Sequence, residues 1–193
     1  MNEPDWIATF LRESNAIDPQ PTDRDPETPA NKWHEEALLY AIQLAHEDRF
    51  ALPREAHQLL LREDPRAGRV RENEMLIGFR ETMPAKLIPR HFIAWNQRVL
   101  QVISGLRKAD STTEERRLAI WDLHLELMVI HPYELFNGKV GRILLVNHAL
   151  LVDVEPWYVQ CATERAEYFA QIRNHPANGS WKPRAGRKRL TRM

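Results

Sequence analysis

Apolar residues recur along most of this chain at the three- and four-residue spacing of amphipathic helices. The spacing predicts a short opening helix at residues 6–11 and further helices over residues 33–49, 53–61, 89–106, 114–130, 138–152 and 163–174. Four prolines separate the first two helices and should break the chain up to about residue 31: Pro19, Pro21, Pro26 and Pro29. The pattern as a whole predicts an all-α fold.

Two segments differ from the ordinary amphipathic pattern. Residues 64–89 carry several glycines and prolines, and their apolar stretch at residues 75–77 is too short for a helix. We therefore predict a loop with a small β-hairpin at residues 74–83. Residues 114–130 are apolar nearly all round, which predicts that they form the buried central helix of the bundle.

The composition is that of an ordinary globular domain, with 193 residues of which 43% are hydrophobic. We divide the chain into an N-terminal helix with a proline-rich linker (1–31), a main domain (32–176) and a basic tail (177–193). The single cysteine, Cys161, cannot form an internal disulfide. Because the start has neither a basic flank nor a long apolar run, and no apolar run reaches membrane length, we expect a cytoplasmic protein without a membrane partner.

The net charge is zero, but the charges are unevenly distributed. The first 36 residues hold nine acids and three bases, whereas the last twelve residues hold six bases and no acid. A basic end of this kind is typical of a solvated tail. It could also contact nucleic acid, but no aromatic residues alternate with its bases, so nucleic-acid binding is the less favoured interpretation.

A polar, glycine-bearing stretch at residues 131–142 joins two of the predicted helices. If the second helix begins near Gly138, its first backbone amides point out of its positive end and can hold an anion. Lys139 and Arg142 share a face and lean back toward that same end. His131, across the loop, can take the proton of a hydroxyl that attacks a phosphate. The stretch predicts a phosphoryl or nucleotidyl transfer site.

Each part of this stretch also has a simpler interpretation. A histidine such as His131, before proline, often ends a buried helix by hydrogen bonding to the last carbonyls. The Asn137-Gly138 step can be only a turn, and Lys139 and Arg142 can form a solvated face. Zinc-ligand spacing, a P-loop and a dinucleotide fingerprint do not occur in the sequence.

Taken together, the stretch resembles the signature of the Fic family. That signature reads His-Pro-Phe, any residue, Asp or Glu, Gly-Asn-Gly-Arg, two residues of any kind, and Arg. The positions that match or are conservatively replaced are His131, Pro132, Tyr133, Asn137, Gly138, Lys139 and Arg142. The resemblance covers roughly residues 55–175, including a segment at 68–71 that is similar to the family's Gly-x-Tyr-Arg.

The resemblance implies an all-helical Fic fold with a small β-hairpin flap. The resemblance also implies AMPylation, the activity of most family members, in which a Ser, Thr or Tyr hydroxyl of a target protein attacks the α-phosphate of ATP. By position, His131 would be the general base. Asn137 and Gly138 would line the anion hole, and Lys139 and Arg142 would contact the phosphates.

Two further features of the family have counterparts in this sequence. The flap would consist of Leu76, Ile77, Gly78 and Phe79, and it would align the target segment by strand addition. Many family members also carry an inhibitory helix whose glutamate pairs with the last arginine of the signature. Here Ser14 and Asp18 occupy the motif positions, although the same residues can simply end a helix before the proline-rich linker.

The sequence departs from the signature at two adjacent positions. Leu135 replaces the acid that helps bind Mg²⁺, and Phe136 replaces a glycine. Leucine offers no oxygen to a hard cation, and the neighbouring Glu134 would point the other way in an extended loop unless the loop rearranges. We therefore expect a weak or altered protein adenylyltransferase that uses ATP, with impaired Mg²⁺ binding.

Two other classes of function stay open. The first is a catalytically inactive Fic pseudoenzyme that acts by binding a nucleotide or a protein partner. The second is a nucleic-acid-binding module that uses the basic tail. The basic tail is the one sequence feature that supports this second class.

Overall fold

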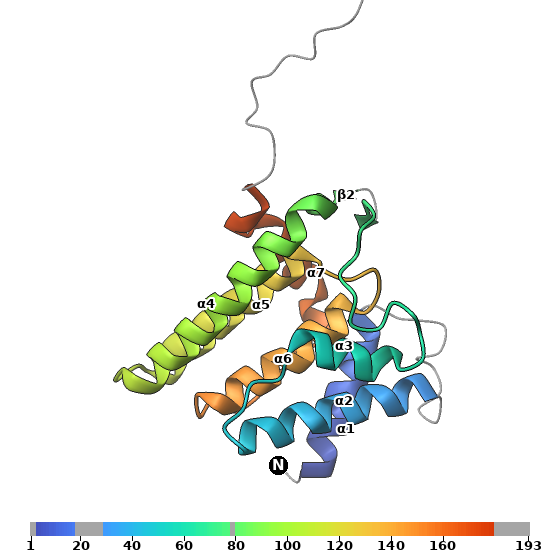
Figure 1. The fold of residues 1–193 in the computed structure, drawn as a ribbon. Helices are drawn as coiled ribbons and strands as arrows, with labels where there is room; N and C mark the ends of the chain where they lie inside the picture. The colour runs from blue at the N-terminus through green and yellow to red at the C-terminus, as the bar shows by residue number, and fades with distance from the viewer. Residues whose placement is uncertain (1–2, 18–28, 78–79, 180–193) are drawn as a thin grey trace, which may run out of the picture.

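The computed structural model describes residues 3–17, 29–77 and 80–179. Their fold is all-helical, apart from two very short strands (Figure 1). The helices are α1 (Glu3–Ile17), α2 (Pro29–His46), α3 (Pro53–Leu61), α4 (Ile88–Lys108), α5 (Thr113–Ile130), α6 (Asn137–Leu151) and α7 (Cys161–Asn174), with 3-10 turns η2 (Ala85–Leu87) and η3 (Pro176–Gly179). None of the described helices is both long and apolar enough to cross a membrane.

The predicted helices form with their ends displaced by a few residues. Pro29, which we expected to break the chain, is instead the first residue of α2. Proline suits the first turn of a helix, where its missing N–H has no intrahelical acceptor. The start of α5 has a capping box, in which the Thr112 hydroxyl accepts from the Glu115 N–H at 3.2 Å and the Glu115 carboxylate accepts from the Thr112 N–H at 2.8 Å.

The central helix of the bundle is α6, and the prediction that residues 114–130 hold that place is wrong. Helix α6 packs against α1, α2, α3 and α5, and 13 of its 15 residues are buried, whereas Leu118 of α5 is 59% exposed. Gly141 explains the close approach of α5, because a Cβ atom there would lie 2.3 Å from the Met128 side chain. The hydrophobic pattern did not predict the burial of α6 because several of its buried residues are polar.

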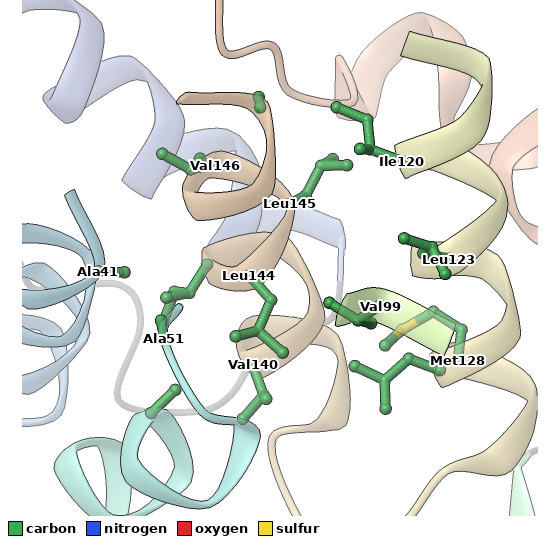
Figure 2. Close-up of a cluster of buried hydrophobic side chains, with 14 of the residues drawn as sticks. Ala41, Ala51, Val99, Ile120, Leu123, Met128, Val140, Leu144, Leu145 and Val146 are labelled. Atoms are coloured by element: carbon green, nitrogen blue, oxygen red, sulfur yellow. The ribbon is translucent and has the colours of Figure 1, made fainter. Parts of the chain in front are cut away.

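The hydrophobic core lies on both sides of α6 (Figure 2). The labelled α6 residues lie between small residues of α2 and the following loop on one side and side chains of α4 and α5 on the other. These residues are Val140, Leu144, Leu145 and Val146 of α6, Ala41 and Ala51, and Val99, Ile120, Leu123 and Met128. Helix α1 adds Phe10 and Ile17 to the same core.

Strands β1 (Leu76–Ile77) and β2 (Arg80–Glu81) pair antiparallel, with Leu76 opposite Glu81 and Ile77 opposite Arg80. The pairing is thus limited to two residues on each strand, and Gly78 and Phe79 lie outside the described residues. The division of the chain at residues 31 and 176 stays a prediction, as does the flap role of the strand pair.

Candidate functional site

His131 caps the C-terminal end of α5 in the left-handed conformation, at φ 50° and ψ 61°. Its backbone N–H donates to the Leu127 carbonyl at 2.9 Å. Although the residue keeps part of its surface exposed, the surrounding protein and the charge of Arg71 lower the pKa of its imidazole to about 4, while a hydrogen bond with the Met128 backbone opposes this shift. The imidazole is therefore neutral at neutral pH, which is the state that a general base requires.

The loop between His131 and α6 is closed by the side chain of Asn137. The amide oxygen of Asn137 accepts from the Tyr133 N–H at 2.9 Å, and its nitrogen donates to the Tyr133 carbonyl at 2.7 Å. The side chain is only 3% exposed, so it braces the loop and does not face a ligand. What Asn137 can offer an anion is its backbone N–H.

Helix α6 starts at Asn137, as an anion-binding helix terminus requires. The first hydrogen bond of the helix runs from the Val140 N–H to the Phe136 carbonyl at 2.9 Å, so the N–H groups of Asn137 and Gly138 precede it. Phe136 precedes the helix with a φ of 58°, and its own side chain provides no capping hydrogen bond. Gly138 leaves room for a cation, because a Cβ atom there would lie 2.8 Å from the Arg142 Nη1 atom.

The two signature cations are buried, so the interpretation of Lys139 and Arg142 as a solvated face is wrong. The Nζ atom of Lys139 lies 5.2 Å from the centroid of the Phe136 ring, a distance at which a cation interacts with the ring face. The Arg142 guanidinium folds back over Gly138 toward the start of α6. Both cations therefore lie near the start of α6, where protein covers them.

Helix α1 supplies the cover over Arg142. The guanidinium donates from Nε to the Ser14 hydroxyl at 2.8 Å and from Nη2 to the Ser14 carbonyl at 2.9 Å. His34 lies next to this contact, with Nε2 3.5 Å from the Ser14 hydroxyl and Nδ1 3.1 Å from the Asn15 side-chain oxygen. Ser14 thus contacts the last arginine of the stretch, while Asp18 falls outside the described residues, and the inhibitory role of both stays a prediction.

No family model matches the sequence, and neither does any curated protein. Among solved structures, the chain is similar to the crystal structure of a Fic domain containing signaling protein from Bacteroides thetaiotaomicron, with 16% identity over 88% of this chain and 71% of that chain, at a TM-score of 0.70. The chain has the Fic fold. At this identity the similarity establishes the arrangement of helices, and it does not extend to the chemistry of the signature.

His57 is a residue of this Fic fold that sequence reasoning missed. Its ring stacks on Tyr133 with centroids 3.9 Å apart. Its Nδ1 accepts from the Gly68 N–H at 2.8 Å, which assigns the ring proton to Nε2, and Nε2 then donates to the Leu135 carbonyl at 3.2 Å. Burial lowers the pKa of His57 to about 4. A lone histidine on an apolar helix carries no sequence signal for this loop-bracing role.

Arg71 is the arginine of the segment that resembles the family's Gly-x-Tyr-Arg, but the sequence alone predicted no role for it. It is only 3% exposed. Its Nε donates to the His131 carbonyl at 2.9 Å, and its backbone N–H donates to the Pro132 carbonyl at 2.8 Å. Arg71 therefore holds the backbone at the start of the signature loop.

The signature loop does not fit a Mg²⁺ ion. The side chain of Leu135 has no oxygen, and its carbonyl already accepts from His57. The Glu134 carboxylate lies 3.8 Å from the Arg66 guanidinium and 3.3 Å from the Asn73 side-chain nitrogen. Within the described ranges, no group of three or more His, Cys, Asp or Glu side chains could hold a metal ion.

A cavity of about 380 Å³ lies away from this loop. Its lining comes from α1, α2, the last turns of α6 and the segment that follows: Trp6, Ile7, Ile42, His46, Leu150, Glu155 and Pro156. Since Leu150 is near the C-terminal end of α6, the cavity and the signature loop are at opposite ends of this helix.

Proposed function

We propose that this protein belongs to the Fic family and is a nucleotidyltransferase of low turnover, which transfers AMP from ATP to the hydroxyl of a target protein in the cytoplasm. One observation carries the proposal. In a Fic fold, His131 is neutral and held by its backbone at the loop that leads to the cationic start of α6. A neutral imidazole at that position suits proton abstraction from a hydroxyl.

In the proposed reaction, His131 takes the proton of the target hydroxyl. The hydroxyl oxygen forms a bond to the α-phosphorus of ATP, the bond from that phosphorus to the bridging oxygen breaks, and pyrophosphate leaves. The backbone N–H groups of Asn137 and Gly138 would hold the phosphate oxygens, and Lys139 and Arg142 would offset their charge.

Low turnover follows from two features of the site. Leu135 stands in place of the acid that would help hold Mg²⁺, so the loop does not fit this ion and the transition state lacks its charge. In addition, Arg142 donates two hydrogen bonds to Ser14, so phosphates must compete with α1 for this guanidinium. Both features lower the stabilisation available to the transition state.

The target segment would add to the strand pair. Leu76 of β1 is 64% exposed, and a two-residue strand leaves backbone groups available for pairing with an extended segment. We propose that residues 76–79 form this docking flap, of which Gly78 and Phe79 lie outside the described residues.

The second candidate is a pseudoenzyme that binds a nucleotide or a partner protein without turnover. The specific observations in its favour are the hydrogen bonds from Arg142 to Ser14 and the absence of an oxygen from the Leu135 side chain. A protein with this function would retain nucleotide affinity but transfer no AMP.

Labelling with [α-³²P]ATP separates the two candidates. The parent protein, His131→Ala, Ser14→Ala and Asp18→Gly would each be incubated with Mg²⁺ or Mn²⁺, alone and with cell lysate. The matched control is His46→Ala, an exposed histidine far from the signature loop. AMP transfer would be supported if the parent and His46→Ala become labelled and His131→Ala does not. Absence of label from the parent, Ser14→Ala and Asp18→Gly would reject it, and calorimetric ATP binding would then favour the pseudoenzyme.

A further inference from the structure

We propose that Arg71 is a positioning residue that joins the strand pair β1–β2 to His131, so that the paired strands and the general base are held as one unit. The inference rests on the proposed function, because it gives a role to the coupling between a docked target and the base. The structural link itself can be tested without any activity.

On the side of the base, Arg71 binds backbone on both sides of the His131–Pro132 peptide bond. Its Nε donates to the His131 carbonyl at 2.9 Å, and its N–H donates to the Pro132 carbonyl at 2.8 Å. His131 has a left-handed backbone, which a residue other than glycine adopts only where its surroundings impose it. These two hydrogen bonds help to impose that conformation.

On the side of the strands, the same guanidinium binds the residues that flank the strand pair. Its Nη1 donates to the Asn73 carbonyl at 2.6 Å, before β1. Its Nη2 donates to the Thr82 hydroxyl at 2.9 Å and to the Met83 carbonyl at 2.5 Å, after β2. All three guanidinium nitrogens are therefore used, and the planar fork fixes their acceptors relative to one another.

The strand pair depends on this support because it is very short. Two residue pairs are far fewer than an independently stable sheet requires. Next to the strands, the N–H and the hydroxyl of Thr82 donate to the Met75 carbonyl at 3.2 and 3.0 Å. Because Arg71 binds the same hydroxyl, movement of the strands is transmitted to its guanidinium.

Arg71 also influences the protonation of His131, since its positive charge acts with burial to lower the pKa of the imidazole. Burial lowers the pKa of the Arg71 guanidinium, and the nearby negative charges of Glu74 and Glu134 oppose this shift. Glu134 also contacts Arg66 and Asn73, whereas burial and then the charges of Lys139 and Arg142 lower the pKa of His34. Arg71 therefore both orients the base and favours its neutral form.

The test follows the His131 ring by NMR titration and the strands by amide hydrogen exchange in the full chain. Arg71→Gln should raise the pKa of His131 toward its ordinary value. Arg71→Lys retains the positive charge, so the His131 pKa should stay as low as in the parent protein. Both variants should speed amide exchange at residues 75–77 and 80–83 about tenfold or more, as expected when hydrogen bonds to a charged group are lost. Arg69→Gln, an exposed neighbour, should change neither quantity.

Thr82→Val keeps the proposal testable if the Arg71 variants do not fold. Valine has the same shape but lacks the hydroxyl that accepts from Arg71. We expect faster exchange in the strands together with shifted His131 resonances, although Thr82 does not contact that ring. Unchanged His131 resonances beside faster strand exchange would overturn the coupling. If the NMR link holds but no variant ever transfers label, the proposed function fails and the structural link stands.

Discussion

Tyr133 places a hydroxyl where the Fic signature has phenylalanine. The residue is fully buried, with its ring stacked on His57 and edge-on to Phe92 at a centroid distance of 6.0 Å. Its hydroxyl has no hydrogen-bond partner within the described part of the chain. Burial raises the pKa of this hydroxyl, so it is neutral and its cost is that of an unpaired polar group, about 1–3 kcal/mol.

Tyr133→Phe should therefore increase the free energy of unfolding by about 1–2 kcal/mol, because it removes an unpaired hydroxyl and keeps the ring. Urea denaturation measures this change. The matched control is Tyr168→Phe, which should decrease stability, since the Tyr168 hydroxyl is 2.9 Å from His124 Nε2. A loss of stability in Tyr133→Phe would show that the hydroxyl has a partner after all.

Leu135→Asp combined with Phe136→Gly should restore metal-dependent labelling if these two positions alone limit turnover. Aspartate supplies a carboxylate for Mg²⁺ or Mn²⁺, and glycine adopts the φ of 58° at position 136 without steric cost. We expect at least about a tenfold rise in label, since metal-ion catalysis is worth several kcal/mol.

The control for this double variant is Phe136→Ala, which removes the ring from above Lys139 but adds no acid. It should not gain metal dependence. An unchanged rate in the double variant would point to Lys139 or the strand pair as the limiting feature.

Between elements, the decisive contact joins α1 to α6. Ser14→Ala removes the acceptor of the Arg142 Nε bond and leaves the backbone bond from Nη2 in place. A hydrogen bond to a charged group contributes about 1.5–3 kcal/mol, so α1 should detach more readily. We expect faster amide exchange in residues 6–17 and tighter ATP binding by calorimetry.

The comparison variant on the same helix is Arg12→Ala, an exposed side chain whose contact is with the neighbouring Glu13. It should leave both exchange and affinity unchanged. Tighter binding in Arg12→Ala as well would mean that α1 responds to any substitution, and the specific role of Ser14 would be lost.

At the scale of the whole molecule, buried neutral histidines make stability depend on pH. Burial lowers the pKa of His57 to about 4, of His124 to about 3 and of His148 to about 4. In the unfolded chain these groups titrate near the ordinary value of about 6.5. Between these values the unfolded state binds more protons, so stability is complete above about pH 6.5 and falls as the pH drops toward 4.

Each of these histidines contributes up to roughly 3 kcal/mol to this loss. Urea denaturation midpoints measured from pH 7.5 to pH 4.5 should therefore decrease steadily. His57→Gln should flatten the profile, whereas the exposed control His46→Gln should leave its slope unchanged. A profile that stays level down to pH 4.5 would contradict the burial of neutral imidazoles.

The number and order of the helices among the described residues could be predicted from the sequence because helix formation depends on local information. The apolar spacing that predicts each helix lies within the helix itself, and the Thr112 capping box lies within a few residues of the start of α5, although Pro29 starts α2 where a break was expected. The motif from His131 to Arg142 was equally local, so its position at the start of a helix could be predicted as well.

Only the tertiary structure decided which helix is central and which partners the motif residues find. Helix α6 is buried because Gly141 admits α5 and because Asn147 accepts from the Ala51 N–H at 3.1 Å and donates to the Ala41 carbonyl at 2.8 Å. Arg142 meets Ser14 across 128 residues of sequence, and Arg71 meets His131 across 60. Such contacts depend on how the helices pack. A periodic hydrophobic pattern contains no information on which polar groups, far apart in the sequence, will form a hydrogen bond with each other.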